Sequence, residues 1–230
     1  MLHPGRRPKA RFPPVPPDSD SPRPAPRFVD PYAHAPRLPD EGSLDLRAVF
    51  HGPRAPGPVE LEIGPGRGWF TVERLELDPG AYVVGLEIKR KWATIVDERL
   101  KKRGLGGRGR VFAEDARLIV PRLVQESLAR VYLHFPDPWW KKRHQKRLVL
   151  GAPLLDGLVR ALAPEGEFFV QTDVLERAER YESEIDAHGG FRPVQATARI
   201  EDHSYGARSP RERIAIRDGI PVYRLLYQKR

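Results

Sequence analysis

A carboxylate, two aromatic rings and a run of cations stand together between residues 136 and 147. Prolines fix the backbone on either side of Asp137, and Trp139 and Trp140 follow, which could stack on an unpaired base. The run also carries cations suited to phosphates: Lys141, Lys142, Arg143, Lys146 and Arg147. Catalysis on a nucleic-acid base requires this combination. The alternative is a proline turn with buried tryptophans before a solvated basic helix.

Gly64, Gly66 and Gly68 follow a short apolar strand and open a helix. Glycine suits a position where the backbone turns sharply and a ligand approaches closely. A dinucleotide fingerprint would place its third glycine at position 69, which is Trp69, so a pyrophosphate cradle is disfavoured. With the acid Glu62 before it, the loop better suits a ligand with an ammonium group and no phosphates, such as S-adenosylmethionine. A glycine turn without a ligand is the alternative.

Two further acids follow neighbouring strands. Glu87 ends the second strand, where a carboxylate can accept both hydroxyls of a ribose. Asp115 follows the third strand and could meet an adenine amine, or serve only as a helix N-cap, a position that Asp favours. We interpret His134 as a packing residue at a strand end and His144 as part of the basic helix start.

The candidate site residues can meet only if the secondary-structure elements bring the ends of several strands together. The apolar pattern predicts strands at 59–63, 82–88, 111–112, 130–135, 167–172, 191–200 and 221–228, and helices at 44–50, 69–77, 89–103, 117–126, 146–162 and 174–188. The alternation implies right-handed βαβ units and a mostly parallel α/β sheet with helices on both faces. Ligands bind at the carboxyl ends of such strands. The glycine loop and the tip of the strand before Asp137 should therefore border one cavity.

The composition is that of a globular protein with a basic surface. The chain has 230 residues, of which 40% are hydrophobic, and a net charge of +9, which attracts polyanions. Residues 89–110 hold nine Lys/Arg against two acids, which indicates either a second RNA-contact zone or a solvated helix face. Residues 153–190, in contrast, are acidic and should point away from RNA. The absence of cysteine excludes disulfides, cysteine-ligated metal sites and a thiol nucleophile.

The first 40 residues differ in composition from the rest of the chain. They hold twelve of the 25 prolines and seven Arg/Lys against four Asp, so we expect a flexible basic arm over 1–40 and one domain over 41–230. No apolar run is long enough to span a membrane or to resemble a signal sequence, which makes the cytoplasm the expected location.

Several segments together resemble the tRNA (guanine-N7-)-methyltransferase family, over residues 59 to about 175. The matching pieces are residues 61–68, 85–88, 114–116, the run Phe135-Pro136-Asp137-Pro138-Trp139 with Lys141 and Arg143-His144 after it, and Thr172-Asp173. The resemblance implies a class I, Rossmann-like fold and transfer of a methyl group from S-adenosylmethionine to N7 of a guanine in the tRNA variable loop. It implies no metal and leaves the oligomeric state open.

The resemblance also implies residue roles. Glu62, Glu87, Asp115 and the glycine loop would hold the cofactor, with Asp137 beside it as the catalytic acid, and Lys141 and Asp173 would contact the substrate. The family's Thr-x-aromatic-Glu substrate motif is best matched by Ser209, Pro210, Arg211 and Glu212, where arginine replaces the aromatic residue. Glu114 stands where the family usually has asparagine.

Three other functions fit parts of the pattern. Enzymes that methylate exocyclic amines carry Asp/Asn-Pro-Pro-aromatic at this strand end, but Asp137-Pro138-Trp139 lacks the second proline. A non-catalytic RNA-binding module on the same fold would not need intact Glu62, Glu87 and Asp137. A dinucleotide oxidoreductase is disfavoured by Trp69 in the loop.

Overall fold

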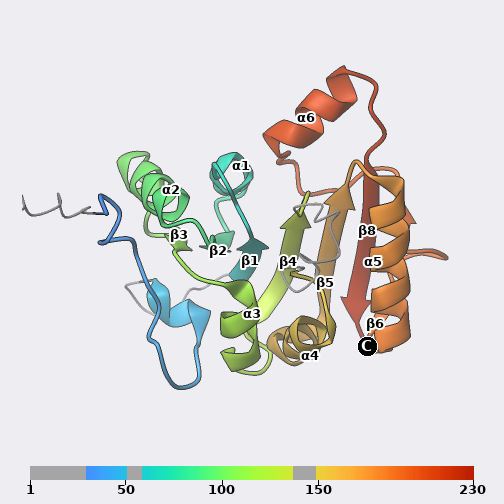
Figure 1. Ribbon diagram of the computed structural model, residues 1–230, viewed down its shortest axis with the longest axis horizontal. Coiled ribbons are helices and arrows are strands. Elements are labelled where there is room, and N and C mark those ends of the chain that lie inside the picture. The colour runs from blue at the N-terminus through green and yellow to red at the C-terminus, as the bar shows by residue number, and fades with distance from the viewer. Residues whose placement is uncertain (1–29, 51–58, 137–148) are drawn as a thin grey trace, which may run out of the picture. The chain divides into compact units, whose positions relative to one another are not determined.

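The computed structural model describes residues 30–50, 59–136 and 149–230 (Figure 1). Pro31–Arg230 forms one compact unit. In the described part of the chain, no helix has the length and apolar character needed to cross a membrane.

An eight-stranded mixed sheet organises this unit. Its strands are β1 (Val59–Ile63), β2 (Tyr82–Leu86), β3 (Gly109–Phe112), β4 (Leu128–His134), β5 (Leu162–Thr172), β6 (Phe191–Pro193), β7 (Arg199–Ile200) and β8 (Tyr223–Lys229). The order is β3-β2-β1-β4-β5-β8-β6, with β7 also paired to β8. The first five strands are parallel, and β8 is antiparallel to β5, β6 and β7. The strand order reverses between β1 and β4, which is where such sheets bind ligands.

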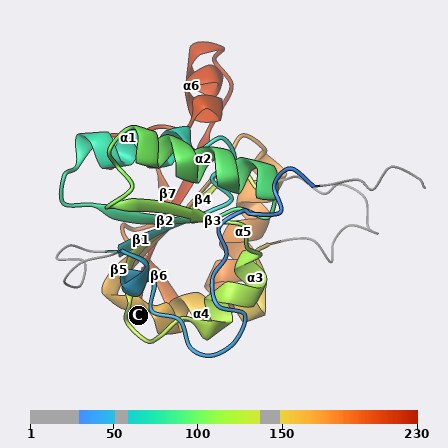
Figure 2. The same ribbon diagram turned by 90° about the vertical axis from the view of Figure 1, so that its left-hand side faces the viewer.

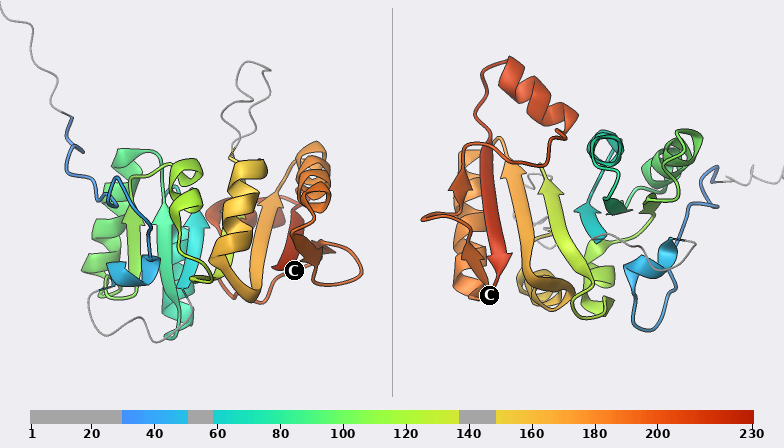
Figure 3. Two further views of the ribbon diagram at one scale, coloured as in Figure 1. Left: turned by 90° about the horizontal axis from the view of Figure 1, so that it is seen from below. Right: turned by 180° about the vertical axis from the view of Figure 1, so that it is seen from behind.

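Helices cover both faces of the sheet. Figure 2 shows α1 (Trp69–Leu77) and α2 (Arg90–Lys102) on one side and α3 (Ala116–Ile119), α4 (Ala152–Ala161) and α5 (Leu175–His188) on the other. The last helix, α6 (Pro210–Arg217), lies beyond the carboxyl ends of β4 and β5 instead of on a face (Figure 3). Helices η1 (Leu46–Val49) and η2 (Val120–Arg122) are short 3-10 turns. This arrangement confirms the predicted fold class.

The five residues of β1, Val-Glu-Leu-Glu-Ile, are all buried although they alternate in polarity. Leu61 joins the main apolar core, whereas Glu60 faces α1 and is neutralised there. Arg74 donates two hydrogen bonds to Glu60 at 2.7 and 2.9 Å, and Arg130 and Tyr132 donate one each at 3.0 and 2.9 Å. A buried carboxylate needs such partners, because an unpaired one would be very costly to desolvate.

Several elements differ from the prediction for local reasons. The helix predicted at 117–126 is split into α3 and η2, since Pro121 supplies no amide hydrogen. The strand predicted at 191–200 is two short strands, the helix at 44–50 is a single 3-10 turn, and α6 was not predicted. The helix predicted from residue 146 begins at Ala152, with Gly151 as its N-cap and a proline in its first turn; its residues 146–148 lie outside the described residues.

Residues 31–40, assigned from the sequence to the arm, pack against the sheet. Ala35 and Leu38 are buried. The carbonyl of Pro36 accepts a hydrogen bond from Ala113 at 2.7 Å, directly after β3. The side chain of Glu114 accepts from the Leu38 amide at 2.9 Å and from Arg37 Nε at 2.7 Å. The predicted arm thus includes a docked segment; its residues 1–29 lie outside the described residues.

Candidate active site

The glycine loop joins β1 to α1 with three left-handed residues. Gly64, Gly66 and Gly68 have φ values of 71°, 55° and 70°. A Cβ atom added at Gly64 or Gly66 would meet nothing within 4 Å, whereas one at Gly68 would lie 2.2 Å from Cγ1 of Val96. The first two glycines therefore leave open space beside the backbone, and the third allows α1 and α2 to approach closely.

Glu87, at the end of β2, holds this loop in place. Its carboxylate accepts a hydrogen bond from the Gly66 amide at 3.0 Å and another from the Lys89 amide at 2.9 Å. Each carboxylate oxygen keeps a second lone pair. The residue is 6% exposed, and it borders a cavity at the carboxyl edge of the sheet.

The cavity has a volume of about 660 Å³, which lies in the range of small-molecule sites. One wall is the glycine loop with Glu87, another is the turn after β3, and a third is the end of β4. The lining residues include Gly64, Gly66, Arg67, Glu87, Trp92, Glu114, Asp115, Arg117, His134, Phe135 and Pro136. The sequence predicted one cavity bordered by both the glycine loop and the tip of β4, and the structure contains it.

Asp115 is both a helix cap and part of the cavity wall. As the N-cap of α3 its side chain accepts from the Arg117 amide at 3.0 Å, and its carboxylate pairs with Arg117 Nη2 at 2.5 Å. The hydrogen bond from the Arg117 guanidinium lowers the pKa of Asp115 despite its partial burial. The two interpretations left open by the sequence are therefore compatible in the structure.

Glu62 is buried and does not line the first cavity. Its carboxylate accepts a hydrogen bond from Thr71 Oγ1 and lies 3.1 Å from Nδ1 of His134. It borders a second cavity of about 220 Å³ between the glycine loop, the tip of β4 and α6. Since Glu62 does not line the first cavity, direct binding of a cofactor ammonium by Glu62 stays a prediction.

The backbone turns sharply at the end of β4, immediately before the run that the sequence predicts to be catalytic. Phe135 has a φ of 45°, uncommon for a residue with a side chain, and its amide donates to the Gln171 carbonyl of β5 at 2.8 Å. His134 is buried against Glu62, as expected of a packing residue, with edge-to-face contacts to Phe70 and Phe169. The remaining site residues of this run lie outside the described residues: Asp137, Trp139, Lys141, Lys142, Arg143, Lys146 and Arg147.

The Ser209-Pro210-Arg211-Glu212 motif forms the start of α6. Ser209 is the N-cap, and its Oγ accepts from the Glu212 amide at 3.2 Å. Arg211 forms a bidentate pair with Asp173 at 2.9 and 3.0 Å, and its guanidinium lies 5.2 Å from the centre of the Phe135 ring. Two predicted substrate residues, Arg211 and Asp173, thus pair at the carboxyl end of β5, and Ser209 and Arg211 both border the second cavity.

Glu212 is fully buried and holds α6 to the sheet. It pairs with Arg224 Nη2 of β8 at 2.8 Å and with Arg208 Nη1 at 2.6 Å. Burial raises the pKa of Glu212, but hydrogen bonds from His203 and Arg224 outweigh that effect and lower the pKa to about 2. These contacts support a positioning role, and direct contact of Glu212 with the substrate stays a prediction.

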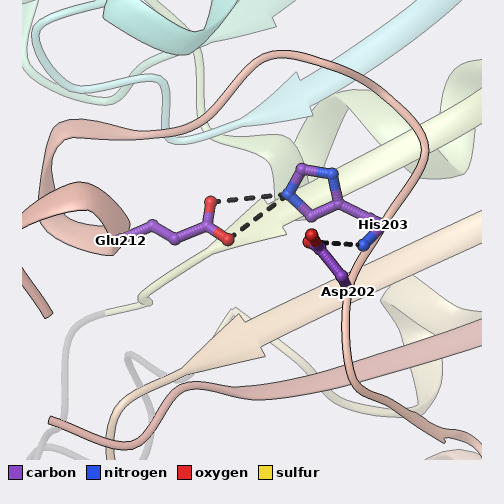
Figure 4. Close-up of side chains that lie close together, drawn as sticks. All are labelled: Asp202, His203 and Glu212. Atoms are coloured by element: carbon purple, nitrogen blue, oxygen red, sulfur yellow. Dashed lines mark hydrogen bonds and ion pairs between the residues drawn. The ribbon is translucent and has the colours of Figure 1, made fainter. Parts of the chain in front are cut away.

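Asp202, His203 and Glu212 lie close together (Figure 4). Each of them offers one potential ligand atom, and these atoms lie within 4.8 Å of one another. The guanidinium of Arg208 bonds to Asp202 at 2.6 Å and to Glu212 at 2.6 Å. A positive charge therefore already occupies the space between the carboxylates. We interpret the cluster as an ion-pair brace for the loop before α6.

Solved structures share this architecture. The aminoglycoside resistance methyltransferase NpmB1 aligns with a TM-score of 0.52 and 17% identity, covering 75% of this chain and 87% of that one. TrmN from Thermus thermophilus aligns with a TM-score of 0.52 and 21% identity, covering 76% and 45%. Together with the strand order and the edge cavity, they define a class I methyltransferase fold.

Sequence comparison is more specific. A family model described as "Putative methyltransferase" matches residues 56–225. A tRNA (guanine-N(7)-)-methyltransferase of Myxococcus xanthus is 38% identical over 169 residues, covering 73% of this chain and 82% of that protein. One of Parasynechococcus marenigrum is 34% identical over 199 residues, covering 84% and 81%. The chain belongs to the tRNA (guanine-N7-)-methyltransferase family.

Proposed function

We propose that this chain transfers a methyl group from S-adenosylmethionine to N7 of a guanine in the variable loop of tRNA, in the cytoplasm. The observation that supports the proposal is one cavity lined by the glycine loop, Glu87 and Pro136, because Pro136 immediately precedes Asp137 in the sequence. The family's named relatives support tRNA as the substrate.

The cavity walls suit S-adenosylmethionine. Gly64 and Gly66 leave space where side chains would otherwise project, and no phosphate-binding third glycine is needed. Glu87 offers free lone pairs to ribose hydroxyls, and Asp115 stands where an adenine amine can donate to it. When bound, the cofactor supplies a sulfonium methyl group open to in-line displacement.

Positioning dominates the chemistry that this chain must perform. N7 of guanine carries an in-plane lone pair and no proton, so no general base is required. Correct orientation of two reactants can lower a barrier by about 7–11 kcal/mol. Asp137 would favour a site that stays positively charged during transfer, or accept from the guanine N1 and amino groups and so select guanine. Trp139 would stack, and Lys141, Lys142, Arg143, Lys146 and Arg147 would contact RNA.

The decisive experiment incubates the protein with unmodified tRNA and labelled S-adenosylmethionine, then maps the methyl group by reduction and aniline cleavage, which cuts at N7-methylguanine. We expect one cleavage site in the variable loop. A label recovered as N6-methyladenosine would assign the protein to the amine methyltransferases instead. A protein that binds the cofactor by calorimetry but transfers no methyl group to any tRNA would contradict the proposal.

Asp137→Ala tests the assignment of the catalytic acid. We expect most activity to be lost while the thermal midpoint and the affinity for S-adenosylhomocysteine stay close to wild type. His144→Ala serves as the control within the same run, because that residue is assigned no role in the transfer step. An Asp137→Ala variant that methylates tRNA at the wild-type rate refutes the assignment.

A further inference from the structure

A row of exposed and half-buried aromatic and cationic side chains lies beside the cavities. We define the Trp69–Trp92 ridge as Trp69, Trp92, Arg67, Arg99 and Arg103. The guanidinium of Arg67 lies 5.3 Å from the centre of the Trp92 ring, and the Arg67 carbonyl accepts a hydrogen bond from Arg99. The guanidinium of Arg99 lies 4.5 Å, and that of Arg103 5.8 Å, from the centre of the Trp69 ring. The ridge is therefore continuous.

The ridge connects the site to the outer surface. Trp92 borders the first cavity, Arg67 borders the first and second, and Trp69 borders the second. Trp69 also borders a groove of about 400 Å³ between α1 and α6, to which Arg103 and Arg213 contribute. A chain leaving the site between the glycine loop and α6 would pass over Trp69.

Positive charge on the ridge is poorly neutralised. In the described residues, Arg67 and Arg99 form no ion pair with a carboxylate. Arg103 pairs with Glu76 at 2.6 Å, but both side chains are nearly half exposed, and such pairs contribute little. Burial lowers the pKa of Arg99, and the neighbouring charge of Arg103 lowers it further. A bound polyanion would relieve this repulsion.

Trp69 is 41% exposed although it is the first residue of α1. An exposed tryptophan among arginines is the surface that single-stranded RNA uses, since bases stack on the ring and phosphates contact the cations. An acidic peptide would satisfy the arginines but would offer no planar base to stack on the indole rings. The combination therefore favours RNA.

We propose that the Trp69–Trp92 ridge binds the RNA nucleotides that flank the target guanine, by stacking on Trp69 and by phosphate contacts with Arg99 and Arg103. The proposal rests on the proposed function, because it assumes that a tRNA base enters the adjoining site. It extends RNA binding beyond the basic run at 141–147 to the helix α2, which the sequence left open between an RNA-contact zone and a solvated face.

The test measures binding of unmodified tRNA to the full chain with S-adenosylhomocysteine present, at several salt concentrations. Trp69→Ala should weaken binding about 5- to 150-fold, the range for loss of one stacked base, and Trp69→Tyr should restore most of it. Arg99→Gln/Arg103→Gln should reduce the slope of log affinity against log salt by about 1.5. Affinity for S-adenosylhomocysteine should not change, because none of these residues borders the first cavity.

Arg192→Gln is the matched control. Like Arg103, it is a half-exposed arginine paired with an exposed glutamate, but it lies on β6 at the opposite edge of the sheet. Wild-type affinity and an unchanged salt slope in the ridge variants overturn the proposal, and so does an equal loss in Arg192→Gln. Wild-type protein that neither binds nor methylates tRNA overturns the proposed function itself, which is measured before any variant.

Discussion

Two alanine substitutions in the glycine loop should have opposite consequences, although they are only two residues apart. Gly66→Ala places a methyl group in the open cavity, and its cost to folding is the left-handed backbone alone, about 1–2 kcal/mol. Gly68→Ala carries the same backbone cost and also forces its Cβ to within 2.2 Å of Cγ1 and 2.8 Å of Cγ2 of Val96. Overpacking of this kind adds about 1–3 kcal/mol.

We therefore expect Gly68→Ala to lower the free energy of unfolding by about 2–5 kcal/mol, and Gly66→Ala by only about 1–2 kcal/mol. Among molecules that remain folded, cofactor affinity should fall more in Gly66→Ala than in Gly68→Ala. The Gly66→Ala methyl group occupies space that the cofactor needs, so its affinity should fall about 5- to 150-fold if the same overpacking cost applies. Gly68→Ala should bind the cofactor more nearly as wild type does.

Urea unfolding by linear extrapolation gives the stabilities, and calorimetry with S-adenosylhomocysteine gives the affinities. Val96→Ala removes the methyl groups that Gly68→Ala would meet, so the double variant should lose about 1–3 kcal/mol less than the two single losses predict. Two results would refute the assignment of packing to Gly68 and ligand binding to Gly66. One is equal destabilisation by Gly66→Ala and Gly68→Ala. The other is a double variant, Gly68→Ala with Val96→Ala, whose loss of stability equals the sum of the two single losses.

Two further predictions follow from buried carboxylates. Because the folded pKa of Glu212 is depressed to about 2 from 4.5, its stabilisation is present above pH 4.5 and is lost as pH falls toward 2. The difference in unfolding free energy between wild type and Glu212→Gln should shrink over that window by about 3 kcal/mol; a pH-independent difference contradicts the ion-pair brace. Glu114→Gln should speed amide exchange at Leu38, whose amide donates to Glu114, while Leu61 at the centre of β1 should exchange as in wild type.

The alternating strands and helices could be predicted because the spacing of apolar residues and the positions of glycine and proline indicate the same element bounds along most of the chain. α1 ends at Leu77 as predicted, where Asp78-Pro79-Gly80 cannot continue it. α6 was missed although its signal was present: Ser209 as N-cap, Pro210 in the first turn and Glu212 three residues after the cap. A helix-start pattern and a substrate motif occupy the same four residues, and we interpreted the pattern only as the motif.

The cavity at the carboxyl ends of the strands could be predicted, but not the hydrogen-bond partners of the acids near it. Strand ends place Glu62 and Glu87 near the glycine loop in any parallel sheet. That Glu62 contacts Thr71 and His134, whereas Glu87 contacts the Gly66 amide, depends on side-chain directions across separate strands and a helix. The docking of Arg37 on Glu114 joins residues 77 positions apart and has no local signal in the sequence.

Burial and hydrogen-bond partners distinguish the acid that borders the first cavity, Glu87, from the acids that hold the fold together. Glu60 and Glu212 are fully buried and each is neutralised by two arginines, so a ligand cation gains little from either. Glu87 has backbone amides as partners and borders the open cavity, so its negative charge remains available at the cavity wall. Arg67 of the Trp69–Trp92 ridge borders the same cavity as Glu87, so a negative and a positive side chain face one space, as the proposed pairing of a cationic donor with a polyanionic substrate would need.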